Sequence, residues 1–387
     1  MALTSRQRVL CALTHEEPDR VPLDFGGTQT GILVQPYNEL KSALGLETPT
    51  QVGNLVLGLA RIEEPVLERF AIDFRHILPR MPATWKFELR ADDSFYDDWG
   101  IRWQRPPGSY YYDMVYAPLR SASLEALENY RWPNPLDPGR VSGTAEEAAE
   151  LHTTSDYAIE AGLVGLWESA WFLVGMEDWL VAVYKSPDFV EALLDGVLET
   201  LKKMHTAYLD EVGPYVDLVT LWDDYGAQCS TLISPSAWRR LVKPRLAELV
   251  STLKSRTRAY IGLHCCGAIS ALLDDLVEVG IQVVNPVQVS ARGMDPTSLK
   301  RRYGKNLTFW GAIDSQKLLP GGSEAEVRHT VRSILADLGP GGGYILAGVH
   351  NIQPGVPARN IIAMYDTALQ SGRYPLNLES EAYLEVA

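Results

Sequence analysis

Residues 259–286 read AYIGLHCCGAISALLDDLVEVGIQVVNP, and this stretch establishes the fold. It begins with a short apolar run at 259–263, continues with helical apolar spacing at 268–279, and ends in a second apolar run at 281–286. Gly280 stands where the helix should end, because glycine is favoured just past a helix C-terminus. A strand, a helix and a second strand in this order predict a parallel β-α-β unit.

The same alternation extends over most of the chain. Eight short apolar runs have the length and composition of buried strands. They cover residues 21–25, 72–76, 159–165, 216–222, 259–263, 281–286, 307–311 and 344–348. Stretches with helical spacing include residues 235–252, 268–279, 323–338 and 356–371. Eight strand–helix units favour a (β/α)8 TIM barrel of the α/β class over a doubly wound open sheet, and we expect one domain over residues 1–387.

One segment departs from this alternation. Residues 86–116, KFELRADDSFYDDWGIRWQRPPGSYYYDMVY, are aromatic and polar. Turn signals at residues 92–93 and 106–108 predict one or two β-hairpins. We expect an insertion between the second and third barrel units, near the catalytic mouth or at an oligomer contact.

The charge balance argues against nucleic acid as a partner. The chain has 35 basic and 49 acidic side chains, for a formal net charge of −14. Binding to phosphates needs clustered lysine and arginine. The one dense basic run, residues 300–302, is typical of a solvated helix end.

Other features argue against a membrane and against an oxidising compartment. Four cysteines in 387 residues do not form a disulfide framework. Charged residues interrupt the short apolar run near the N-terminus, so we expect no signal peptide. No run approaches about 18 uncharged apolar residues, so we expect no membrane span and a cytoplasmic location.

Polar side chains collect where the predicted strands end. In a (β/α)8 barrel the active site lies at the carboxyl ends of the strands. The residues found there are Gly26, Gly27, Arg75, His76, Glu168, Asp223, Asp224, His264, Cys265, Cys266, Gly267, Asn285, Gln288, Asp314, His350 and Asn351. We therefore expect the functional site at this end of the barrel.

A metal site is the sharpest prediction from these residues. His264 and Cys266 lie two positions apart where a strand ends, so their side chains can point to the same side. Zinc readily takes an imidazole nitrogen together with a thiolate, and His350 is the best candidate for a third ligand. Three protein ligands leave a fourth position open, as catalytic zinc requires. The alternative is a buried histidine beside two packed thiols.

Candidate acids and bases surround this site. Glu168 stands among Trp167 and Trp171, where its pKa could be raised for use as an acid, or it is a surface residue at a helix start. Asp223 and Asp224 could supply a base, a metal ligand or a charge partner, or could cap a helix.

The remaining candidates have equally open roles. His76 could be a proton donor or ligand, or a satisfied histidine on the barrel rim. The aromatic residues, Trp99 among them, could stack on an aromatic substrate or belong to the core. We expect substrate contacts from Trp167, Trp171, Trp222, Asn285, Gln288 and Asp314.

Four motifs carry a family resemblance. They are LISPSAWRRLVKPRLAEL at 232–249, HCCG at 264–267, WGAID at 310–314 and VHNIQPGVPARNI at 349–361. With these motifs the chain resembles the uroporphyrinogen decarboxylase superfamily over nearly its whole length, and it is most similar to a mainly uncharacterised subgroup. The resemblance implies a (β/α)8 barrel and, by default, a homodimer.

The resemblance to true uroporphyrinogen decarboxylases is poor at their functional positions. Their carboxylate-gripping arginine motif is absent from VPLDFGGTQTG at 21–31. His76 stands in FRHIL at 74–78, where they carry a catalytic aspartate. A strongly acidic protein is also a poor electrostatic host for a substrate with eight carboxylates.

A second branch, the zinc- and corrinoid-dependent methyltransferases, resembles the chain more closely at the site. Their zinc motif is His-x-Cys plus a distant Cys, and His264 and Cys266 match its first part. His350 occupies the region of the distant Cys, so the last ligand is His350, Glu168 or an aspartate at 223–224. The corrinoid-binding motif Asp-x-His-x-x-Gly is absent, so a corrinoid would come on a separate partner protein.

The resemblance implies transfer of a methyl group from a small methylated or methoxylated donor to that corrinoid. Zinc would polarise the leaving heteroatom, and Glu168, His76 or an aspartate at 223–224 would protonate it. Zinc could instead activate a thiol acceptor. Two alternatives are a decarboxylase of a smaller acid, with Arg75 as the carboxylate-binding residue, and a non-catalytic barrel that binds a corrinoid partner.

Overall fold

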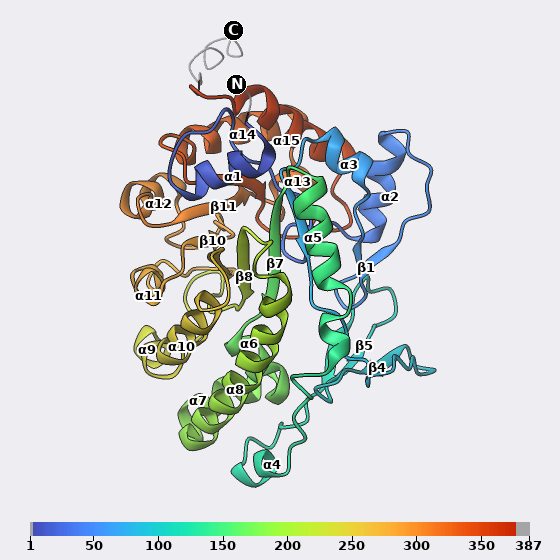
Figure 1. Cartoon of the computed structure of the whole chain (residues 1–387), viewed down its shortest axis with the longest axis vertical. Coiled ribbons are helices and arrows are strands. Elements are labelled where there is room, and N and C mark those ends of the chain that lie inside the picture. The colour runs from blue at the N-terminus through green and yellow to red at the C-terminus, as the bar shows by residue number, and fades with distance from the viewer. Residues whose placement is uncertain (1–2, 377–387) are drawn as a thin grey trace.

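Seven parallel strands form the central sheet of the computed structural model, which describes residues 3–376 (Figure 1). Around the sheet they are β12 (Tyr344–Gly348), β11 (Thr308–Ile313), β10 (Val283–Asn285), β9 (Tyr260–His264), β8 (Leu218–Trp222), β7 (Ala158–Val164) and β3 (Phe74–Ile77). Strands next to each other in this order pair in parallel. The observed bounds differ from the expected runs by no more than two residues.

The first expected strand, residues 21–25, is not a regular strand. It makes a single parallel bridge, between Leu23 and Leu346 of β12. The N–H of Asp73, the residue before β3, donates to the Leu23 carbonyl at 2.9 Å. The segment therefore touches both edges of the seven-stranded sheet and closes the TIM barrel. Pro22 has no N–H to donate, which helps to explain why a longer ladder does not form.

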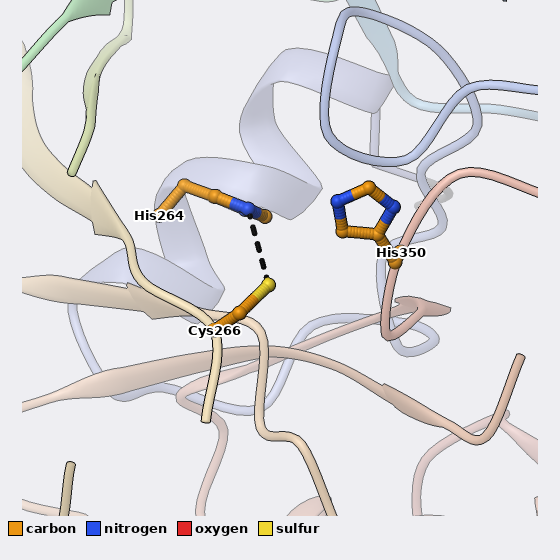
Figure 2. Close-up of side chains that lie close together, drawn as sticks. All are labelled: His264, Cys266 and His350. Atoms are coloured by element: carbon orange, nitrogen blue, oxygen red, sulfur yellow. Dashed lines mark hydrogen bonds between the residues drawn. The ribbon is translucent and has the colours of Figure 1, made fainter. Parts of the chain in front are cut away.

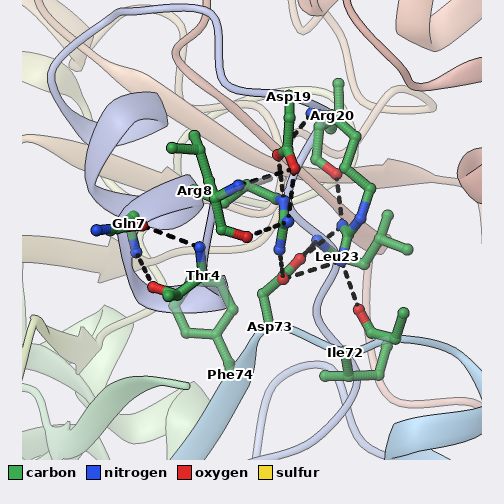
Figure 3. A network of polar contacts seen from close by, with 12 residues as sticks. Thr4, Gln7, Arg8, Asp19, Arg20, Leu23, Ile72, Asp73 and Phe74 are labelled. Atoms are coloured by element: carbon green, nitrogen blue, oxygen red, sulfur yellow. Dashed lines mark hydrogen bonds and ion pairs between the residues drawn. The ribbon is translucent and has the colours of Figure 1, made fainter. Parts of the chain in front are cut away.

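Buried ion pairs hold this closing segment in place (Figure 3). The fully buried carboxylate of Asp73 lies 2.7 Å from Nη1 of Arg8 and 2.7 Å from Nη1 of Arg20, and it accepts the N–H of Leu23 at 2.8 Å. Arg8 belongs to α1 (Ser5–Leu13), whose Val9 packs against apolar side chains of several barrel strands. Helix α1 thus covers one end of the barrel.

Helices surround the sheet (Figure 1). They are α2 (Val34–Ala43), α3 (Glu64–Arg69), α4 (Leu124–Glu128), α5 (Thr144–Thr154), α6 (Leu166–Val174), α7 (Met176–Lys185), α8 (Pro187–Val212), α9 (Pro235–Leu241), α10 (Lys243–Lys254), α11 (Leu273–Val279), α12 (Pro296–Tyr303), α13 (Leu318–Gly321), α14 (Glu324–Leu338) and α15 (Ala358–Ser371), with a 3-10 turn at Pro138–Val141. The expected helix at 235–252 is divided into α9 and α10. No helix within residues 3–376 is long and apolar enough to cross a membrane.

The insertion between the second and third barrel units is confirmed. Its strands β4 (Ser94–Tyr96), β5 (Arg102–Gln104) and β6 (Asp113–Tyr116) form an antiparallel sheet that projects from the barrel (Figure 1). Trp103 of β5 packs against Phe172 of α6, with ring centroids 5.3 Å apart. A separate two-stranded sheet joins β1 (Val52–Asn54) and β2 (Leu59–Ala60).

Candidate metal centre

Three side chains converge where β9 and β12 end (Figure 2). His264 is the last residue of β9, Cys266 follows two residues later, and His350 lies two residues beyond the end of β12. One ligand atom from each lies within 4.8 Å of the other two. The expected same-side arrangement of residues 264 and 266 is therefore present, and His350 is the side chain that joins them.

The spacing of the His264 and Cys266 ligand atoms fits zinc. Nε2 of His264 lies 3.5 Å from Sγ of Cys266. Zn–N bonds of about 2.05 Å and Zn–S bonds of about 2.3 Å at a tetrahedral angle separate such ligands by about 3.6 Å. Two imidazoles and one thiol are also a donor set that zinc accepts, with a fourth position left for a substrate or water.

Asn285 sets the orientation of the His264 ring. Asn285 ends β10 and pairs with His264 in the strand register. Its Oδ1 lies 2.5 Å from Nδ1 of His264. Because a carboxamide oxygen can only accept, we assign the ring proton to Nδ1, and the lone pair of Nε2 then faces Cys266.

Burial prepares the two imidazoles for a metal. It lowers the pKa of His264 to about 4, against the opposing hydrogen bond to Asn285. Burial also lowers the pKa of His350 to about 4, with His264 adding to the effect. Both rings are therefore neutral near pH 7 and need not lose a proton to bind a cation.

The thiol of Cys266, unlike the two imidazoles, must lose a proton to bind a metal. Burial, followed by the negative charges of Asp224 and Glu168, raises its pKa well above the ordinary value. A bound divalent cation would reverse this and hold the thiolate form. The acidic surroundings of the thiol thus favour occupation of the site by a cation.

Glu168 lies at the start of α6 and faces the same acidic neighbours. Burial raises its pKa well above the ordinary value, and the charges of Asp224 and Asp223 add to the effect. Its carboxyl group therefore keeps its proton to a higher pH than an exposed glutamate does, which favours the form that a general acid needs.

The two adjacent aspartates have different partners. Asp223 is fully buried and accepts the N–H groups of residues 166–168 at the start of α6, together with the Tyr225 hydroxyl. These contacts indicate that Asp223 caps the start of α6. Oδ1 of Asp224 accepts the N–H of Cys266 at 2.6 Å, so Asp224 positions the backbone of a candidate ligand.

His76 belongs to a separate buried cluster. Its ring nitrogens lie 2.9 Å from Oδ1 of Asp24 and 2.9 Å from Oε2 of Glu160. Burial alone would lower its pKa, but the two carboxylates outweigh burial and raise it to about 10. Both N–H groups are engaged and the ring stays charged at neutral pH, which favours a structural role over proton donation.

Only some of the expected substrate contacts line a cavity. Gln288 lines a cavity of about 190 Å³ that also contains Cys266 and His350. Trp222 lines a second cavity. Trp167 is 1% exposed and packs against Trp179, which leaves it no surface for a substrate.

Two other expected contacts are engaged locally. Trp171 lies against Phe172, with ring centroids 3.8 Å apart. Asp314 accepts the N–H groups of Gln316 and Lys317 in the loop after β11. Asp314 does not belong to the group of ligand atoms that converges at the mouth.

Asp24 and Glu160 were not among the expected residues. Each is an acidic residue inside an apolar, strand-like run, and each is fully buried. A buried carboxylate needs a partner, so an acid within a predicted strand is the signal that could have revealed this cluster.

Comparisons with known proteins agree with the architecture. Residues 114–370 match the uroporphyrinogen decarboxylase (URO-D) family. The chain is 24% identical to a uroporphyrinogen decarboxylase of Alkalilimnicola ehrlichii, over 97% of this chain and 96% of that protein. It is also 24% identical to a uroporphyrinogen decarboxylase of Thioalkalivibrio sulfidiphilus, over 49% of this chain and 51% of that protein.

A solved structure shares the barrel. The fold is similar to that of a methyltransferase from Methanosarcina mazei, with a TM-score of 0.64 at 20% sequence identity. The match covers 95% of this chain and 99% of the methyltransferase. At this identity the likeness shows the fold alone, and it agrees with the superfamily resemblance carried by the motifs.

Proposed function

The chain belongs to the uroporphyrinogen decarboxylase family, and from this premise we propose that it is a zinc-dependent methyltransferase. It would move a methyl group from a small methylated or methoxylated donor to a corrinoid carried on a separate partner protein. The observation that carries the proposal is the convergence of His264, Cys266 and His350. Family membership alone supports an enzyme of the methyltransferase-like or decarboxylase-like kind.

The side chains divide the work in the following way. His264, Cys266 and His350 would hold the metal, which when bound supplies a Lewis acid for the heteroatom that carries the methyl group. Glu168, whose pKa is raised by burial, would donate a proton to that heteroatom as the methyl group leaves. Asp224 would keep Cys266 in position through the backbone N–H.

Decarboxylation of a smaller acid receives less support from the site. Its expected carboxylate-binding residue, Arg75, is engaged with Glu64 through Nε at 3.0 Å. The guanidinium carbon of Arg75 also lies 3.5 Å from the centre of the Tyr157 ring. These partners satisfy its charge, so Arg75 is not available to a substrate carboxylate.

The proposal is tested by methyl transfer to free cob(I)alamin, used as the probe acceptor, from a panel of methylated and methoxylated compounds. Formation of methylcobalamin is followed by absorbance. We expect activity that is lost on chelation and restored by zinc. Glu168→Gln should lower kcat by about 100-fold, while Glu177→Gln, at an exposed position, should have no effect.

Two results would contradict this proposal. One is carbon dioxide release from an acid substrate by metal-free protein, which would establish the decarboxylase alternative. The other is the absence of turnover with every donor in zinc-loaded protein, which would favour the non-catalytic barrel.

A further inference from the structure

The loop after β9 carries Cys266 and turns sharply at the next residue. Gly267 has a positive φ of 91°, a conformation that suits glycine best. A Cβ atom at residue 267 would lie 2.6 Å from the carbonyl carbon of Gly226 and 2.7 Å from the carbonyl oxygen of Ala227. The N–H of Ala268 also donates to the Ala227 carbonyl at 2.8 Å. The turn after the candidate ligand therefore packs directly on the loop that follows β8.

Hydrogen bonds restrain the peptide groups on both sides of Cys266. Its own N–H donates to Oδ1 of Asp224 at 2.6 Å. The next N–H along the chain, that of Gly267, donates to Oε1 of Gln288 at 2.7 Å. Because peptide groups are planar, these two bonds limit φ and ψ of Cys266 and leave χ1 as the main freedom of its thiol. The direction of Sγ toward His264, seen in Figure 2, thus depends on both acceptors.

The carboxamide of Gln288 is itself held in one orientation. Its Nε2 donates to Oε1 of Gln228 at 3.1 Å, and Nε2 of Gln228 donates to the Ser290 carbonyl at 2.5 Å. The N–H of Gly267 can only donate and the carbonyl of Ser290 can only accept. The direction of the whole chain of hydrogen bonds is therefore set from both ends. This chain ties together the loops that follow β8, β9 and β10.

Gln288 also borders the space into which the candidate ligands open. Its buried side chain lines the cavity of about 190 Å³ together with Cys266 and His350. Its oxygen is engaged by a backbone N–H and its nitrogen by another side chain. A carboxamide with protein partners at both ends is better suited to support the loop than to bind a substrate.

We infer that Gln288 is a positioning residue of the metal centre. By accepting the N–H of Gly267, it holds the thiol of Cys266 where it can bind the ion together with the two histidines. It acts through the backbone and supplies no ligand atom. This inference rests on the proposed function, because it assigns a residue to the metal centre of that reaction.

The zinc affinity of the full-length protein tests this inference. Loss of a group that orients a metal ligand typically weakens metal binding by about 10-fold to 100-fold. We expect about 10-fold for Gln288→Leu, because Asp224 still holds one side of Cys266. Gln288→Glu should retain the wild-type affinity, because a carboxylate oxygen can still accept the backbone N–H. Gln370→Leu, at an exposed position of α15, is the control and should change nothing. Competition with a chromophoric chelator measures all four proteins.

A second measurement reports on the thiol itself. Cobalt(II) in place of zinc gives a charge-transfer absorption band when a thiolate binds it, and Cys266→Ser supplies the spectrum without that band. At saturating cobalt the band should be weaker in Gln288→Leu and restored in Gln288→Glu. A residue that supports only the fold would lower the free energy of unfolding, measured by urea denaturation, and leave the band unchanged.

A variant at the exposed Gln228 keeps the test decisive if Gln288→Leu does not fold, which circular dichroism would show. Gln228→Leu leaves the acceptor of Gly267 in place but removes the group that orients it. We expect zinc affinity and the cobalt band to fall in the same direction as in Gln288→Leu, by a smaller factor.

Three results would overturn the inference. One is wild-type zinc affinity with an unchanged cobalt band in folded Gln288→Leu, or in Gln228→Leu if the former does not fold. Another is an equal loss of affinity in Gln288→Leu and Gln288→Glu, which would show that the acceptor oxygen is not what matters. The third, a wild type that binds neither metal, would contradict the proposed function as well. Zinc binding that responds to Gln288 as expected, without methyl transfer to cob(I)alamin, would contradict the proposed function alone.

Discussion

At the scale of single residues, the site depends on which nitrogen of His264 is free to bind a metal. The Oδ1 atom of Asn285 lies 2.5 Å from Nδ1 of His264 and accepts its proton in a hydrogen bond, which leaves Nε2 free. In metal sites, an oxygen that accepts the second N–H of a ligating histidine fixes the ring, and its loss typically weakens metal binding by about 10-fold to 100-fold. Asn285, expected as a substrate contact, is thus better described as a positioning residue.

Substitution of Asn285 should therefore change zinc affinity. We expect Asn285→Leu to weaken zinc binding by about 10-fold to 100-fold, and Asn285→Asp to retain affinity because an acceptor oxygen remains. Competition with a chromophoric chelator measures both. Asn129→Leu, at an exposed position, is the matched control. Equal affinities of Asn285→Leu and the control would show that the amide does not orient His264.

The sequence predicted part of this site and not the remainder. Residues 264 and 266 share a side because they lie two positions apart at a strand end, a periodicity that is visible in the sequence. The partnership of Asn285 with His264 depends on the register between β9 and β10, which the sequence does not reveal. The engagement of Asp223 at the start of α6 likewise depends on the approach of a separate segment.

At the scale of elements, a buried ion cluster ties three segments together. Asp24 comes from the closing segment at 21–25, His76 from β3 and Glu160 from β7. Any Cβ at Gly26 or Gly27 would lie within 2.8 Å of the His76 ring. The two glycines thus allow the chain after residue 25 to pass directly over the imidazolium, and Gly27 does so with a positive φ of 61°.

The stabilisation from this cluster should depend on pH. The pKa of His76 is raised to about 10 from an ordinary value of about 6.5. Its charge therefore stabilises the folded state fully below about pH 6.5, and this stabilisation is lost as the pH rises through about 10.

We expect His76→Gln to lower the free energy of unfolding by about 3 kcal/mol near neutral pH, because Asp24 and Glu160 would lose their buried cation. Urea denaturation between about pH 7 and 10.5 should show the difference from wild type becoming smaller. His329→Gln, at an exposed histidine of α14, provides the control. A difference that stays constant or grows with pH would contradict the assignment of a charged His76.

Element boundaries followed from the sequence where apolar periodicity was strong. Strand β12 has the expected bounds, and the expected helix at 323–338 differs from α14 by one residue at its start. The ion cluster could not be predicted in this way, because apolar periodicity says nothing about which buried acids will meet. Of the roles expected for His76, a proton donor or ligand and a satisfied histidine, the contacts with two carboxylates favour the satisfied histidine.

At the scale of the whole molecule, barrel closure depends on Asp73. Segment 21–25 contributes only one bridge to the sheet, so side-chain contacts supplement its few backbone hydrogen bonds. Asp73 supplies them through Arg8, Arg20 and the N–H of Leu23. The mainly apolar residues 21–25 were predicted to be the first of eight strands. Their sequence does not indicate that charged side chains hold this segment in the barrel.

Loss of the Asp73 charge should destabilise the whole barrel. We expect Asp73→Asn to lower the free energy of unfolding by about 4 kcal/mol, because two largely buried guanidinium groups would lose their shared carboxylate. Asp366→Asn, which breaks the more exposed pair with Arg69, should cost at most about 1 kcal/mol. Similar losses in the two variants, measured by chemical denaturation, would contradict this account of closure.

The most direct test of the central claim is the metal content of purified protein. We predict about one zinc per chain in the wild type, and its loss in His264→Ala, Cys266→Ser and His350→Ala. Cys229→Ser, at an exposed free cysteine, should keep its zinc. Protein without zinc, or zinc that persists in all three cluster variants, would contradict a metal centre at the mouth of this barrel.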